Sequence, residues 1–237
     1  MATYQFQTEV NQLLKLIIHS MYSNKDIFLR EIVSNASDAL DKLKYLTVSD
    51  DNYKDIKVEP RIDISFDEPN KLLTVQDSGI GMNEEDLTAN LGTIARSGTK
   101  AFIEKIANDK NAGESNLIGQ FGVGFYSTFM VSSKVRVVTK RYGSQQAYAW
   151  ESDGVEGYTI APAQKETYGT DVILTIKPDT DQENYSRFLT EYGLKDLIKR
   201  YSNYVRYPIH MTVTKSRALP KPEDAGDDYV PELFPPL

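Results

Sequence analysis

The 237-residue sequence contains no cysteine and only two histidines, His19 and His210. The lack of cysteine excludes disulfides, thiolate metal sites and cysteine nucleophiles, and it is typical of a reducing compartment. Two isolated histidines argue against a histidine-rich metal centre or a histidine-based catalytic triad. The net charge of −7 argues against binding to a nucleic-acid backbone, which usually requires a basic surplus.

Long hydrophobic runs are also missing. The first 18 residues have no basic leader, and Lys15 interrupts their apolar stretch. No small-residue cleavage site follows, so we expect no signal peptide. The longest segment without charge, residues 115–133, contains three glycines and several polar side chains, which argues against a membrane helix. We therefore expect a cytoplasmic protein that binds neither a membrane nor nucleic acid.

The composition, with 40% hydrophobic residues, is that of a globular protein with one large domain or two small ones. Five of the ten prolines follow residue 219, in an acidic, turn-rich tail without periodicity. We predict a folded domain over residues 1–215 and a proline-rich acidic linker over residues 216–237.

Helical and alternating apolar patterns succeed one another along the chain. They predict helices at residues 10–21, 26–46, 84–91 and 100–107, about two helical turns after residue 125, and a helical region at 184–204. They predict strands at residues 4–8, 61–67, 71–77, 134–141, 145–152, 158–160, 170–176 and 207–213, the second and third forming a hairpin. This order favours an α+β two-layer sandwich, in which helices cover one face of a mixed, mostly antiparallel sheet.

The second predicted helix carries the motif REIVSNASDAL, with Glu31, Asn35 and Asp38 along one line. This line runs beside the apolar stripe, so it is suited to line a half-buried cleft. Two carboxylates and a neutral oxygen ligand are typical of a water-activating, metal-assisted site. The alternative is a solvated helix face, with Asp38 and Lys42 as an ordinary i, i+4 pair.

The motif DSGIGM follows the predicted hairpin and places Asp77 at the tip of a strand. Gly79 and Gly81 allow the backbone to approach a flat ligand closely, and a carboxylate there can accept a hydrogen bond from an exocyclic amine. Ile80 and Met82 would supply apolar walls. The alternative is a simple Asp-Ser-Gly turn after the strand.

A glycine-rich segment, GQFGVGF at residues 119–125, precedes the short predicted helix. Free backbone amides in such a segment can cradle phosphates. The spacing fits no Rossmann fingerprint and no Walker A lysine is present, so a nucleotide here requires a different architecture. Residues 91–102 contain Arg96 and Lys100 and are suited to a lid, and Gly169 and Thr170 open a strand where a hydroxyl can reach a base through water.

These motifs, in this order, resemble the nucleotide-binding domain of the heat-shock protein 90 chaperones. The resemblance extends from Phe6 to about residue 215 and implies the Bergerat-type ATP-binding fold, which gyrase, MutL proteins and histidine kinases share. It implies that Glu31 is the general base and that Asn35 gives its side-chain oxygen to Mg²⁺. It also implies that Asp77 recognises the adenine amino group, while Asp38 is a supporting group beside the base pocket.

Further nucleotide contacts follow from the same resemblance. Gly81 and Thr170 would assist Asp77 through water, Met82 and Phe125 would contact the base or sugar, and Asn90 the ribose and phosphate region. Arg96 stands where the family often has a lid lysine, so its phosphate contact has a different geometry. The phosphates would meet the segment formed by Gly119, Gln120, Phe121, Gly122, Val123 and Gly124.

The resemblance implies an ATPase domain of a molecular chaperone that uses ATP, ADP and Mg²⁺. It implies that binding of Mg-ATP is coupled to lid closure, N-terminal dimerisation and client protein folding. Its expected partners are client proteins and, in the full-length protein, its own middle and C-terminal domains and a second copy in a homodimer. Hydrolysis by this domain alone is expected to be slow, because family members take an arginine from the middle domain. The alternatives are a mismatch-repair or histidine-kinase relative, or an interaction module that binds no nucleotide.

Overall fold

The computed structural model describes residues 24–56, 59–92, 124–155 and 157–213, together with the backbones of residues 2–5, 217–218 and 233–234. Within these ranges, an eight-stranded sheet has the strand order β1-β6-β5-β4-β7-β3-β2-β8. Its strands are β1 (Ala2–Gln5), β2 (Ile62–Asp67), β3 (Leu72–Asp77), β4 (Ser132–Lys140), β5 (Ala147–Ser152), β6 (Gly157–Ala163), β7 (Gly169–Ile176) and β8 (Ile209–Thr212).

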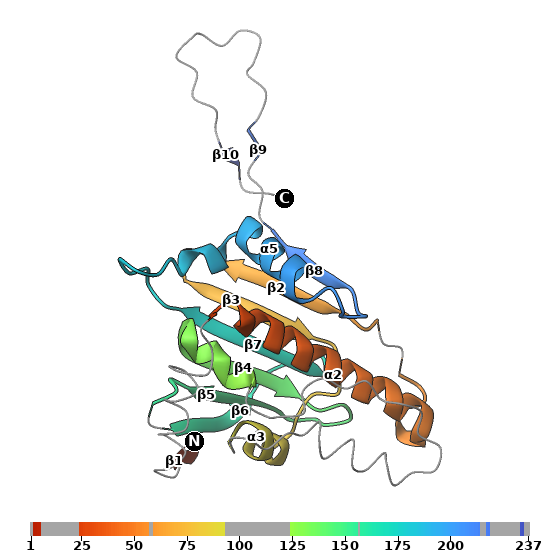
Figure 1. Ribbon diagram of the computed structural model, residues 1–237. Coiled ribbons are helices and arrows are strands. Elements are labelled where there is room, and N and C mark those ends of the chain that lie inside the picture. Colours follow the sequence, from red (N-terminus) through yellow and green to blue (C-terminus); the bar gives the residue numbers. More distant parts are fainter. Residues whose placement is uncertain are drawn as a thin grey trace.

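All pairs of neighbouring strands in this sheet are antiparallel except β2 and β8, which are parallel. The helical elements are α2 (Ile27–Ser49), η2 (Asp51–Tyr53), α3 (Glu84–Leu91), η3 (Gly124–Met130), η4 (Ser186–Leu189) and α5 (Glu191–Tyr201). Figure 1 shows α2, η3 and α5 on one face of the sheet. The predicted α+β sandwich with a mixed, mostly antiparallel sheet is therefore confirmed.

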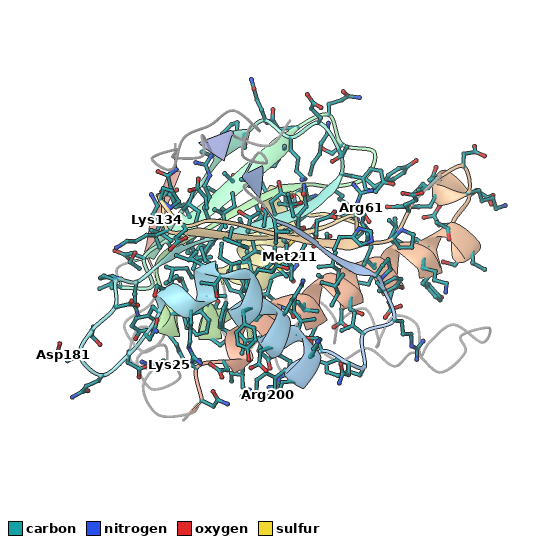
Figure 2. The ribbon with its side chains drawn as sticks, turned by 90° about the horizontal axis from the view of Figure 1, so that it is seen from above. Lys25, Arg61, Lys134, Asp181, Arg200 and Met211 are labelled. Atoms are coloured by element: carbon teal, nitrogen blue, oxygen red, sulfur yellow. The ribbon has the colours of Figure 1, made fainter. Side chains whose placement is uncertain are left out.

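The long helix α2 lies across the sheet and organises the core. Most of its apolar side chains recur at helical spacing and are buried, whereas in its last turns Lys44 is exposed and Asp41 and Lys42 are half-buried. The helix contacts β2 and β3 beneath it and η3 and α5 beside it. The edge-to-face contact between Phe28 and Phe188, with ring centroids 5.0 Å apart, joins α2 to η4. Seen from above in Figure 2, side chains fill the layer between the sheet and these helices.

Several local predictions agree with the observed elements. The hairpin of β2 and β3 pairs Ile62 with Asp77 and Asp67 with Leu72. The helix α3 has the predicted bounds because Asn83 and Asp86 form a reciprocal capping box at its start. The predicted helices at residues 10–21 and 100–107 lie outside the described residues.

Other predictions need correction. The helical region at 184–204 divides into η4 and α5, because Thr190 is extended and its hydroxyl accepts a hydrogen bond from the Gly193 N–H, which starts a new helix. The last predicted strand is shorter than expected, and it pairs in parallel at the sheet edge. In the predicted linker, β9 (Arg217–Ala218) and β10 (Leu233–Phe234) pair with each other. The domain boundary at residue 215 stays a prediction.

No helix in the described part of the chain combines the length and the apolar character needed to cross a membrane.

Candidate active site

Three polar side chains form a row across β3, β7 and β4 on the face that the helices cover. Asp77 is paired with Thr170, and Thr170 with Thr139, and all three are buried. The adjacent row on the same face is apolar, with Val75, Val172 and Val137 in register. Because buried polar groups are costly without partners, a polar row at this end of the strands marks the floor of a candidate site.

Asp77 is the one acid of this row, and its pKa is strongly shifted. Its Oδ1 accepts a hydrogen bond from the Gly79 N–H at 2.8 Å, and the Thr170 N–H also donates to the carboxyl. Burial raises the pKa of Asp77 from 3.8 to about 7, since these two donors only partly offset the loss of hydration. The predicted Asp-Ser-Gly turn is therefore formed. Its Gly79 N–H holds Oδ1 of Asp77, and the carboxyl group lies at the edge of the site.

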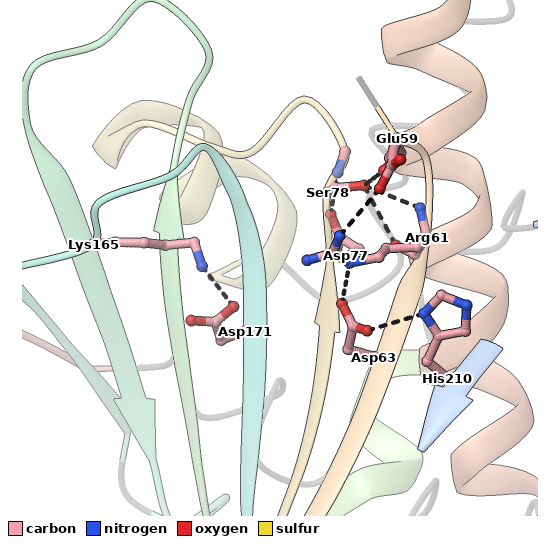
Figure 3. Close-up of polar contacts among 9 residues, drawn as sticks. Glu59, Arg61, Asp63, Asp77, Ser78, Lys165, Asp171 and His210 are labelled. Carbon is pink, nitrogen blue, oxygen red and sulfur yellow. Dashed lines mark hydrogen bonds and ion pairs between the residues drawn. The ribbon is translucent and has the colours of Figure 1, made fainter. Parts of the chain in front are cut away.

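An ion pair on the other face of the sheet also acts on Asp77. Lys165 Nζ lies 2.6 Å from Asp171 Oδ1, and the two side chains are only 6% and 20% exposed. The negative charge of Asp171 raises the pKa of Asp77 and the positive charge of Lys165 lowers it. Figure 3 shows this pair beside β7, with Asp77 on the neighbouring strand. These two charges act in opposite directions, and desolvation is the dominant influence.

Hydrogen bonds of Ser78 fix the backbone that follows Asp77. The Ser78 hydroxyl accepts from the Arg61 N–H at 3.1 Å and donates to the Glu59 carbonyl at 3.0 Å. Arg61 in turn pairs with Asp63 at 2.7 Å, and His210 on β8 lies 3.5 Å from the other oxygen of Asp63. These contacts, drawn in Figure 3, tie the end of β3 to the start of β2.

Close backbone contacts hold the turn after Asp77. Gly81 has φ +68°, and a Cβ at this position would lie 1.9 Å from the Lys140 carbonyl oxygen.

The Ile80 N–H donates to the Ala39 carbonyl of α2 at 3.3 Å, and the Ile80 carbonyl accepts from the Tyr142 N–H at 2.9 Å. The Met82 N–H donates to the Thr139 hydroxyl at 2.9 Å. The turn is therefore fastened to α2 and to β4.

Replacing Gly81 by alanine is expected to destabilise the fold by about 2 to 4 kcal/mol, from backbone strain and the clash with β4. Gly143 provides a matched control, because its φ is +77° but no atom lies within 4 Å of an added Cβ. Gly143→Ala should cost only about 1 kcal/mol of strain. Urea unfolding of both variants measures the difference, and equal losses would show that the contact with β4 is unimportant.

The motif on α2 spreads its three side chains over different environments. Asp38 is buried, Glu31 is half-buried and Asn35 is exposed. Arg30 donates to Glu31 Oε1 through Nε at 3.0 Å, and Glu31 Oε2 lies 2.2 Å from the position of a Cβ on Gly124. The carboxylate of Glu31 is therefore held between Arg30 and the start of η3. The buried Asp38 excludes a fully solvated face.

The two ends of the motif reach two different parts of the site. Glu31 lies against Gly124, whereas Ala39 is bonded to Ile80 in the turn after Asp77. At 1.5 Å per residue these two contacts are about 12 Å apart along the axis of α2. An elongated ligand lying along this helix would meet a polar row at one end and a carboxylate at the other.

The other predicted nucleotide contacts within the described residues lie beside the turn after Asp77 or at the start of η3. The Asn90 amide contacts the Met82 sulfur at 3.8 Å. Arg141 pairs with Asp86 at 2.7 Å and so connects α3 to the end of β4. Phe125 is buried, in edge-to-face contact with Trp150. The other predicted nucleotide contacts lie outside the described residues, namely Arg96, Gly119, Gln120, Phe121, Gly122 and Val123.

Two residues at the site were not singled out from the sequence as functional. Thr139 follows Val135 and Val137 at alternate positions of β4, so a hydroxyl at an inward position was a signal. Lys42 lies one turn beyond Asp38, and burial lowers its pKa while the charges of Asp38 and Asp86 raise it. A lysine near the apolar side of a helix is a weaker signal.

Comparison with known proteins agrees with this geometry. Residues 22–175 match the family of histidine kinase-, DNA gyrase B-, and HSP90-like ATPases. The match includes α2, the hairpin, the turn after Asp77 and nearly all of β7. The chain belongs to this ATPase family.

Within the family, the chain is similar to bacterial proteins named chaperone protein HtpG. It is 54% identical to that of Wolinella succinogenes over 234 residues, covering 99% of this chain and 37% of the relative. It is 48% identical to that of Natranaerobius thermophilus, covering 98% and 37%, and 52% identical to that of Sulfurimonas denitrificans, covering 96% and 35%. The chain thus spans little more than a third of the length of these relatives.

Proposed function

We propose that this chain is the ATP-binding and ATP-hydrolysing domain of an HtpG-type chaperone. The observation that carries the proposal is the arrangement along α2, which has the Asp77 row at one end and Glu31 at the other. That arrangement is suited to an extended nucleotide, with its base at the row and its phosphates near η3. The similarity to HtpG proteins over nearly the whole chain supports the chaperone branch over the mismatch-repair and histidine-kinase alternatives.

At the base end, Asp77 accepts a hydrogen bond from the adenine amino group, and Asp38 supports this end from α2. The Gly79 N–H donates to Oδ1, and we assign the other oxygen to the ligand. Gly81 and Thr170 assist through water. Met82 and Phe125 contact the base or sugar, and Asn90 contacts the ribose and phosphate region. The close packing of Gly81 against the end of β4 supports this assignment, since it fixes the position of the turn beside Asp77.

At the phosphate end, Glu31 orients and deprotonates the attacking water. The bond from Arg30 to Oε1 supports this role because it fixes the carboxylate in one orientation. The segment from Gly119 to Gly124, with Arg96 in the lid, holds the phosphates. The assignments of the segment from Gly119 to Gly124 and of Arg96 depend on the sequence resemblance. Gly124 is the exception, because it lies directly against Glu31.

Mg²⁺ would be held by the side-chain oxygen of Asn35, which is exposed one helical turn from Glu31. When bound there, Mg²⁺ would neutralise charge on the phosphates. The described residues contain no group of three acidic or histidine side chains able to bind a metal ion. A single protein oxygen suits Mg²⁺ in such a site, because this ion usually keeps waters and phosphate oxygens as its other ligands.

The relatives are nearly three times as long as this chain, which supports further domains in the whole protein. We propose that residues 216–237 link this domain to a middle domain, followed by a C-terminal domain through which a homodimer forms. ATP binding would then drive lid closure and dimerisation of the N-terminal domains, and so be coupled to the folding of client proteins. The lack of cysteine supports a cytoplasmic location.

Calorimetric titration of the chain with ATP and ADP, with and without Mg²⁺, tests the proposal. We expect saturable binding of both nucleotides and tighter ATP binding when Mg²⁺ is present. GTP serves as the control for base recognition and should bind far more weakly. Absence of adenine-nucleotide binding by the folded chain would refute the proposed function and leave an interaction module as the alternative.

The pH dependence of binding should follow Asp77. Its carboxylate form accepts the amine hydrogen bond, so adenosine affinity should fall as the pH drops below about 7, approaching tenfold per pH unit. Adenosine is the suitable probe because it carries no phosphate that titrates in this range. The affinity of Asp77→Asn should lack this dependence.

The stability of the free protein should change in the opposite direction. The folded-state pKa of Asp77 is raised from 3.8 to about 7, so its contribution favours folding at low pH and is lost as the pH rises through 7. Asp77→Asn should remove this contribution. Urea unfolding of both proteins between about pH 5 and pH 8 measures the difference, and identical pH profiles would contradict the perturbed pKa.

A further inference from the structure

The fully buried hydroxyl of Thr139 on β4 connects the turn after Asp77 to the start of β7. Thr139 Oγ1 lies 2.9 Å from the Met82 nitrogen, 3.0 Å from Thr170 Oγ1 and 3.1 Å from the Gly169 carbonyl oxygen. Its relative exposure is 0%. One side chain therefore contacts both the turn after Asp77 and the strand that carries Thr170.

Packing alone does not explain a hydroxyl at this position. Val135 and Val137 occupy the preceding inward positions of β4 and are fully buried. Valine has nearly the shape of threonine, and it would avoid the cost of burying a hydroxyl. The hydroxyl at position 139 is therefore explained by its hydrogen bonds.

The donors and acceptors around Thr139 limit how its proton can be placed. The Met82 N–H can only donate, so Thr139 accepts from it. The single hydroxyl proton then goes either to the Gly169 carbonyl or to Thr170. If Thr139 donates to Gly169, Thr170 donates to Thr139 and can only accept hydrogen bonds from a group in the site. If Thr139 donates to Thr170, the Thr170 hydroxyl can donate its own proton to a group in the site.

The proposed ligand selects between these two arrangements. In adenine, two ring nitrogens flank the amine, one bonded to the carbon that carries it and one in the five-membered ring, and both are acceptors. A hydroxyl next to Asp77 that bonds one of them directly must donate to it. A water that joins one of them to the Asp77 carboxylate uses both of its own protons, so the hydroxyl must donate to that water as well. Only the arrangement in which Thr139 donates to Thr170 provides that proton.

We propose that Thr139 is a positioning residue that makes Thr170 a hydrogen-bond donor toward the adenine ring, through a chain from Met82 N–H to Thr139 to Thr170. The inference rests on the proposed function of the site. Each bond in such a chain polarises the next, so the effect reaches the ligand although Thr139 does not touch it. Thr139 thereby favours the binding of a base that has an acceptor nitrogen where Thr170 donates.

The test compares ADP with 1-deaza-ADP and 7-deaza-ADP, which each replace one ring nitrogen by C–H and keep the amine. Calorimetry on the unmodified chain should show about tenfold weaker binding of one analogue. In Thr139→Val, ADP affinity should fall, and the ratio between ADP and that analogue should shrink to within about twofold. Thr139→Ser, which restores the hydroxyl, should retain most of the ratio.

A merely structural role would lower the affinity for ADP and for the analogues by the same factor and leave the ratio unchanged. A ratio retained by folded Thr139→Val, or its absence from the unmodified chain, would overturn the inference. Should the valine variant fail to fold, Thr139→Ala compared with Thr139→Ser decides the same question, because these two differ only by the hydroxyl. Failure of the unmodified chain to bind ADP would instead refute the proposed function.

Discussion

Replacing Glu31 by alanine is expected to lower ATP turnover by at least about 100-fold while ATP still binds. The carboxylate is the proposed general base, and such groups typically raise the rate by a factor of about a hundred to ten thousand. Binding should change little, because the contacts to the base lie at the other end of α2. Release of labelled phosphate over long incubations is the suitable measurement, since the parent chain is itself expected to be slow.

Two further variants make this result specific. Glu31→Gln keeps the size of the side chain but not the basic carboxylate, so it should be as inactive as Glu31→Ala. Glu68→Ala removes an exposed glutamate from the turn between β2 and β3 and should keep the parent rate. Hydrolysis at the parent rate in both Glu31 variants would mean that another group is the base.

Asp77→Asn is expected to weaken ADP binding by about 1.5 to 3 kcal/mol, a loss of roughly ten- to more than a hundredfold. The asparagine oxygen can still accept from Gly79 N–H, which leaves the amide NH₂ facing the adenine amine. Two donors would then oppose each other at the base. Calorimetry with ADP measures the loss directly.

Asp63→Asn is the matched control for this change. Asp63 is also an aspartate in the β2–β3 hairpin, but it pairs with Arg61 and lies on the opposite face of the sheet from Asp77. Its replacement should leave ADP affinity within about twofold, because it removes one negative charge without touching the proposed base end. Unchanged affinity in Asp77→Asn would disprove the assignment of Asp77.

Local elements were largely predictable because their signals are local. Alternation of apolar residues predicted the β2–β3 hairpin, and the bounds of α3 agree with the capping box formed by Asn83 and Asp86. The break at Thr190 was missed because the helical pattern continues across it. The parallel partner of β8 was not predictable, since nothing near residue 209 specifies a strand as distant as β2.

The candidate site was only partly predictable for the same reason. Helical spacing placed Glu31, Asn35 and Asp38 on one line, but it could not give their different burial. Asp38 is buried next to Ala39, where α2 meets the turn after Asp77, and that contact is tertiary. Thr139 gained its role from register with Thr170, which depends on the order of the strands in the sheet.

The parallel pairing of β2 with β8 has a consequence for folding. Ile62 pairs with Ile209, so the loop that closes this contact contains most of the described chain. Contacts between such distant residues form slowly, because the entropy of a long loop must be lost first. During synthesis, β2 would emerge early and keep an open edge until β8 follows. An exposed strand edge invites pairing with other chains, so we expect this edge to be the most aggregation-prone part of a partly made domain.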